Sequence, residues 1–190
     1  GRDRTLLIEL LQRTAADLRA QDETDDLVVQ ARLGAIIGRA FASLEEPQQA
    51  LAVLRPLVER LDRMVVSPQA ADDLSAWQLE RARVYAAFGL ALKVLDDSAY
   101  GGGDRIRRIP ETAAAWTRAM DLFAAHGYLD DPIARDTALR LWMSRQSWPA
   151  DRPFDEFEAW LEPQLMALPD DDPSKWSYRL RKAEIYPWIL

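Results

Sequence analysis

A short sequence pattern recurs along this chain at nearly constant intervals. It occupies residues 28–34 (VVQARLG), 79–85 (LERARVY) and 180–186 (LRKAEIY), and a weaker copy, DPIAR, lies at 131–135. The central alanines, Ala31, Ala82, Ala134 and Ala183, are separated by 51, 52 and 49 residues. Self-similarity at a fixed period is typical of a stack of like units, and such a stack usually works by presenting a surface.

Composition excludes several classes of protein. The 190 residues suit one domain, and a hydrophobic content of 48% provides a sizeable core. The net charge of −7 argues against a nucleic-acid partner, which would require a basic surface. No run approaches the roughly 20 apolar residues of a membrane span, so no membrane insertion is expected. We expect a cytoplasmic protein, and a periplasmic one is the alternative, because the absence of cysteine does not distinguish the two compartments.

Apolar residues recur at helical spacing almost throughout, and no alternating pattern predicts a strand. The spacing predicts about eight helices, at 3–20, 26–44, 46–63, 72–95, 110–126, 132–147, 154–168 and 174–186. Runs of aspartate precede most of them, for example Asp130-Asp131 and Asp170 to Asp172, and we interpret these as helix caps. Calcium binding is the alternative, but the spacing of an EF-hand loop is absent.

The second and fourth predicted helices align over residues 31–44 and 82–95, an offset of 51. The helices that follow them align at an offset of 63, for example Pro47 with Pro110. The extra residues form a glycine-containing loop at 96–109. Each unit is therefore an antiparallel pair, helix A followed by helix B. Gly38 and Gly89 on the A helices would allow close approach beside large residues such as Phe41, Leu92, Leu54 and Trp116.

These residues carry a resemblance to the tetratricopeptide repeat (TPR) family, as found in bacterial multidomain signalling proteins. The matching positions are Ile37, Gly38, Phe41, Ala50 and Leu54. Gly34 replaces the family's aromatic residue, Asp62 stands at the terminal proline, and the period is near 50, where the family has about 34. The resemblance implies an all-α, right-handed α-solenoid of antiparallel helix pairs.

A single repeat domain would span 1–190. Its predicted parts are a leading helix (1–24), unit 1 (25–68), unit 2 (69–129, with the loop at 96–109), unit 3 (130–169) and a terminal helix (170–190). The terminal helix has no helix B after it. It either caps the stack or begins another unit of a longer protein.

The resemblance also implies a binding surface, because helix A lines the inner face of these superhelices. The residues that map to its contact positions include Arg32, Arg39, Arg83, Lys93, Arg135, Trp142 and Arg145. Six of them are cations, which would suit an acidic peptide or a terminal carboxylate. The alternative is that these side chains are solvated or paired with neighbouring acids.

No catalytic constellation is evident. His126 is the only histidine, at the end of a helix, where we expect a structural role. Neither a metal nor a cofactor is predicted. Trp116 and Trp160 are predicted to lie in the core.

We expect a scaffolding module that presents a groove to a peptide or partner protein. The alternatives are a small-ligand sensor domain with a pocket lined by Trp142 or Trp148 and, less favoured, a helical enzyme. A homo-oligomer, or membership of a longer chain, stays open.

Overall fold

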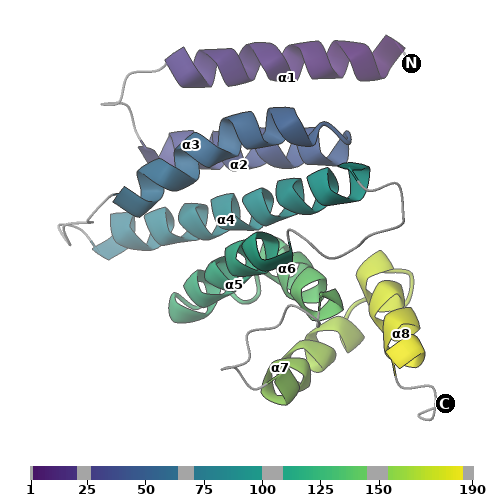
Figure 1. Cartoon of the computed structure of the whole chain (residues 1–190). Helices are drawn as coiled ribbons and strands as arrows, with labels where there is room; N and C mark the ends of the chain where they lie inside the picture. Colours follow the sequence, from purple (N-terminus) through teal and green to yellow (C-terminus); the bar gives the residue numbers. More distant parts are fainter. Residues whose placement is uncertain (1, 21–26, 64–70, 100–108, 145–153, 186–190) are drawn as a thin grey trace.

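The computed structural model describes residues 2–20, 27–63, 71–99, 109–144 and 154–185 (Figure 1). These residues form eight helices and contain no strand, which confirms the all-α class. The helices are α1 (Arg2–Ala20), α2 (Leu27–Ser43), α3 (Pro47–Arg63), α4 (Ala71–Ala99), α5 (Ile109–Ala125), α6 (Pro132–Met143), α7 (Phe154–Met166) and α8 (Pro173–Ile185). Two ends differ from the sequence prediction. Helix α4 continues into the expected loop, where Lys93 pairs with Asp97 one turn later, and α6 ends at Met143.

Local sequence explains where several helices begin and end. Pro47 opens α3, where its missing N–H costs nothing. Asp131 caps α6 by accepting a 2.8 Å hydrogen bond from the N–H of Ile133. Asp172 accepts a bond of the same length from Ser174 at the start of α8. The capping interpretation is therefore confirmed for these two aspartates.

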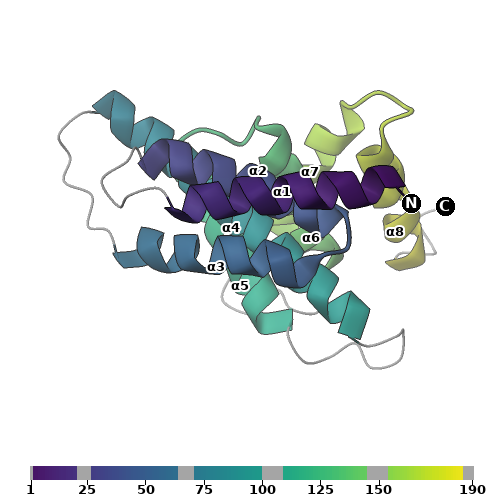
Figure 2. The same cartoon turned by 90° about the horizontal axis from the view of Figure 1, so that it is seen from above.

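The helices follow one another in chain order through the molecule in Figure 1, with α1 at one end and α7 and α8 at the other. Helix α4 packs most extensively, against α2 and α3 on one side and α5 on the other. Helix α6 contacts α4, α5, α7 and α8. Figure 2 shows α1 lying across α2 and α3. The A helices α2, α4 and α6 therefore succeed one another, with each of α3 and α5 packed on the A helices of its own unit and the next.

The glycines on the A helices permit close packing, as predicted. A Cβ atom at Gly38 would lie 2.5 Å from Cδ1 and Cγ of Leu54 on α3. A Cβ atom at Gly89 would overlap the indole ring of Trp116 on α5. Units 1 and 2 thus each bring a large B-helix side chain onto a glycine of the A helix.

Two contiguous apolar clusters form the core. One joins α1, α2, α3 and α4 and includes Ala115 of α5, and the other joins α4 to α8. Trp116 is fully buried in the second cluster, as predicted, and Trp160 is half-buried against it. Trp176 on α8 is exposed. The tryptophans therefore do not share one role.

Candidate functional site: the A-helix face of α2, α4 and α6

A chain of charged side chains crosses the three A helices. Nε of Arg32 on α2 donates to Oε1 of Glu80 on α4 at 2.9 Å, and Nη1 of Arg83 donates to the same oxygen at 3.0 Å. Nη2 of Arg83 then donates to Oδ2 of Asp131, at the start of α6, at 2.6 Å. The charges alternate in sign, so each helix is held electrostatically to the next.

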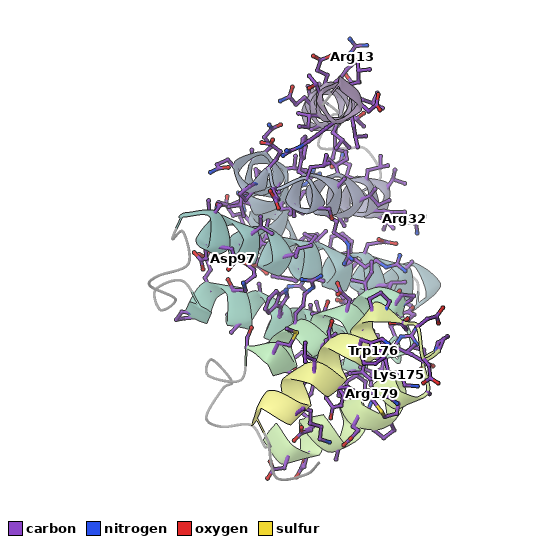
Figure 3. The ribbon with its side chains drawn as sticks, turned by 90° about the vertical axis from the view of Figure 1, so that its right-hand side faces the viewer. Arg13, Arg32, Asp97, Lys175, Trp176 and Arg179 are labelled. Atoms are coloured by element: carbon purple, nitrogen blue, oxygen red, sulfur yellow. The ribbon has the colours of Figure 1, made fainter. Side chains whose placement is uncertain are left out.

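Burial differs along this chain of charges. The Glu80 side chain is only 1% exposed, whereas that of Arg32 is 54% exposed. Burial alone would lower the pKa of Arg83, but Asp131 and Glu80 outweigh it and raise that pKa above its ordinary value. The buried carboxylate of Glu80 is therefore neutralised by two guanidinium groups, one of which reaches solvent, as the outward position of Arg32 in Figure 3 illustrates.

The two interhelical contacts repeat with the sequence. Arg32 and Arg83 are 51 residues apart, and so are their partners Glu80 and Asp131. Asp131 has a second task, because its other oxygen caps α6. The same A-helix arginine thus pairs with the following A helix in both units.

A second cross-link passes over α4. Nη2 of Arg39 on α2 lies 3.4 Å from Oδ2 of Asp136 on α6, and Nε of Arg140 donates to Oδ1 of Asp136 at 3.0 Å. These three side chains are between 27% and 38% exposed. Leu90, which aligns with Arg39, lies buried in α4. This end of the face is therefore bridged by a partly exposed ion pair.

The remaining predicted contact residues have different surroundings. Lys93 pairs with Asp97 on its own helix. Arg135 is half-buried and makes no ion pair with any residue that the structure describes. Trp142 is 1% exposed, packs on Tyr178 with ring centroids 4.7 Å apart, and donates from Nε1 to Glu158 at 3.2 Å. Arg145 and Trp148 lie outside the described residues, as does most of the 96–109 loop.

Sequence reasoning missed the acids that complete this face: Glu80, Asp131 and Asp136. A signal for the first two was present, because Glu80 and Asp131 share the offset that relates Arg32 to Arg83. Asp136 had no such signal, since its partner Arg39 lies two A helices away. Four of the six predicted cations, Arg32, Arg39, Arg83 and Lys93, therefore belong to mixed-charge pairs.

Other candidate sites offer less. A depression of about 350 Å³ lies on α8, and its lining among the described residues is Trp176, Ser177, Arg179 and Leu180. His126 is exposed just beyond the end of α5, before Gly127 at φ +75°. In the described part of the chain no group of three or more His, Asp or Glu residues is arranged to hold a metal ion. Within the same part no helix has the length and apolar character needed to cross a membrane.

Comparison with models of known families, with curated protein sequences and with solved structures found no match to this chain. Evidence on function therefore comes from the A-helix face of α2, α4 and α6.

Proposed function

We propose that this chain is a TPR-like α-solenoid that acts as a protein-interaction module. One observation carries the proposal: the same arginine–acid contact joins α2 to α4 and α4 to α6 at the same residue spacing. Such repetition supports a stack that continues by one rule, and stacks of this kind typically bind partners along an extended face.

The proposed partner is a peptide or protein segment that carries carboxylates. Arg135 is the strongest contact, because it has no ion-pair partner among the described residues. Arg32 and Arg39 would contribute the donors that their single contacts leave over, since a guanidinium has five N–H groups. Arg83 already pairs with Glu80 and Asp131, so we assign it a structural role.

The ion pair between Arg39 and Asp136 affects which charges a bound segment should carry. A segment with carboxylates alone would compete with Asp136 for Arg39 and leave Asp136 paired with Arg140 only, whereas one that also carries a cation would replace the contact that Asp136 loses. We therefore expect bound segments to contain both signs of charge, with a carboxylate directed to Arg135.

The small-ligand sensor is the weaker candidate. Trp142 or Trp148 was expected to line its pocket. Trp148 lies outside the described residues, and the Trp142 side chain is buried against Tyr178 and donates a hydrogen bond to Glu158. No described residue around Trp142 lines the depression on α8. Nothing in the described part of the chain therefore favours a pocket at that tryptophan.

A displayed library of random peptides selected on the wild-type chain tests the proposal. Peptides that are enriched should bind at least ~10-fold more weakly to an Arg39→Glu/Arg135→Glu variant, because reversed charges repel the carboxylate. Reversal at exposed Arg118 on α5 and Arg13 on α1 provides the control with equal net charge. Circular dichroism verifies that both variants keep their helix content.

Selection of no peptide would contradict the proposal. So would peptides that bind the wild type, the double variant and the control with one affinity.

A further inference from the structure

Helix α2 exposes an apolar stripe that its sequence repeat would bury. Val29, Leu33 and Ile36 are 44%, 36% and 58% exposed. Their spacing of four and then three residues places them on one side of the helix, as in the packing seam between two helices. An uncovered seam of this kind is typical of a surface that meets another helix.

The equivalent stripe of α4 shows what this surface does elsewhere in the same molecule. Glu80, Val84 and Ala87 stand 51 residues after the three α2 positions and are completely buried. Val84 and Ala87 belong to the core cluster that contains the α2 alanines, and Glu80 binds Arg32 of α2. In α4, therefore, the stripe is the face that receives the preceding A helix. In α2 the same face is open.

Helix α1 extends the open surface. Leu6, Leu7 and Leu10 are 57%, 44% and 60% exposed, and helical periodicity groups them on one flank. Gln12 lies on the other flank, where it bonds Gln49 of α3. The leucines are therefore on the flank of α1 that faces away from α3.

The stripe of α2 also faces away from α3, because Gly34 and Gly38 on the other side of α2 meet Leu57 and Leu54 of α3. The two apolar stripes therefore lie on the same edge of the molecule. Together they are called the α1–α2 edge.

We propose that the α1–α2 edge is a self-association surface that packs on the same edge of a second copy. The stripes are apolar, and a two-fold axis that runs between α1 and α2 would bring the leucines of α1 in one copy against the α2 stripe of the other. Larger exposed apolar surfaces commonly mark protein interfaces.

The charges beside the stripes favour this occupant. Asp3 and Asp17 are exposed on the leucine flank of α1, whereas Arg32 borders the stripe of α2. In an isologous contact the α1 flank of one copy can meet the α2 stripe of the other, so carboxylates face a guanidinium on both sides of the axis. The interface shares Arg32 with the proposed peptide-binding face, but its apolar stripes contain none of the residues assigned to peptide binding.

Sedimentation equilibrium across a wide range of protein concentrations tests the proposal. The wild type should form a dimer with a dissociation constant in the micromolar range, as suits a small interface. Leu33→Glu and, separately, Leu10→Glu should each weaken it ~10-fold or more, because a charge would be buried against an apolar surface. Both side chains are exposed, so the monomer should fold normally, which circular dichroism verifies.

Leu180→Glu is the matched control, since Leu180 is 66% exposed on α8 at the other end of the stack. It should leave the dimer unchanged. A wild type that stays monomeric at every concentration would overturn the proposal. So would a dimer that survives both edge variants, or one that only Leu180→Glu disrupts. Peptide binding by the dimer-deficient variants separates this result from the fate of the proposed function.

Discussion

The α2–α3 unit and the α4–α5 unit use equivalent A-helix surfaces in different ways. Both place a glycine under a large B-helix side chain, but Gly38 meets the branched end of Leu54 and Gly89 meets the ring of Trp116. At the offset of 63, Leu54 aligns with Thr117 and not with Trp116. The comparison teaches that the repeat preserves close backbone approach, while the side chain that fills the space, and its position on helix B, are free to change.

The largest expected effect lies in those filling residues. Trp116→Ala should lower the free energy of unfolding by about 4 kcal/mol, and Leu54→Ala by about 3 kcal/mol, because a larger ring leaves a larger cavity over the same glycine position. Urea unfolding monitored by circular dichroism measures both. Equal losses of unfolding free energy in the two variants would contradict the expected dependence on the size of the side chain that covers the glycine.

The chain of charges between the units should contribute next. Glu80→Ala should cost about 2–3 kcal/mol, because it removes the buried partner of Arg83 and Arg32, although Arg83 keeps Asp131. Glu59→Ala, at an exposed α3 position, is the control and should change stability by less than about 0.5 kcal/mol. If Glu80→Ala proves as mild as the control, Glu80 does not hold α2 to α4.

Much of this comparison could be predicted from sequence. Helical spacing identified the eight described helices, and the offset of 51 identified the glycine positions. Leu54 and Trp116 were expected beside those glycines, although the offset of 63 does not align them with each other. The pair of Arg39 and Asp136 could not be assigned, because the two residues are 97 positions apart and nothing local connects them. The end of α4 was also missed, since Asp96, Asp97 and Ser98 are weak helix formers that local contacts hold in the helix.

The exposed α2 stripe was missed for a related reason. Val29, Leu33 and Ile36 have the composition of a core face, and sequence alone does not say whether another helix covers it. Coverage depends on which helices lie beside the stripe. The stripe of α4 packs on the A helix α2, whereas the helix that precedes α2 in the described chain is α1.

The glycine positions themselves should differ more modestly. Gly89→Ala should destabilise by about 2 kcal/mol, because the planar indole of Trp116 cannot move aside without repacking. Gly38→Ala should cost about 1 kcal/mol less, since the end of Leu54 can rotate away. Both variants gain up to about 1 kcal/mol in helix propensity, so their difference is the informative quantity. The reverse order in urea unfolding would contradict this assignment.

The smallest expected effect is at the helix ends that precede α3 and α6. Glu45, after α2, and Gly127, after α5, both have positive φ, 57° and 75°. Each end is closed by two backbone hydrogen bonds of the same pattern. After α2, the N–H groups of Glu46 and Glu45 donate to the carbonyls of Phe41 and Ala42. After α5, the N–H groups of Tyr128 and Gly127 donate to those of Phe123 and Ala124. Glu45→Gly should therefore stabilise by up to about 1 kcal/mol, and Gly127→Ala should destabilise by about 1 kcal/mol. Thermal melts with opposite shifts would verify the equivalence; shifts of one sign would not fit it.

One helical surface is core in α4 and open in α2. This difference is tested most directly by placing the same charge at equivalent positions, with the variants Val84→Glu and Leu33→Glu. Urea unfolding is measured at concentrations where the wild type is monomeric. Val84 is fully buried, so Val84→Glu should cost several kcal/mol or prevent folding. Leu33→Glu should stay within about 0.5 kcal/mol of the wild type. Comparable losses at the two positions would contradict the account.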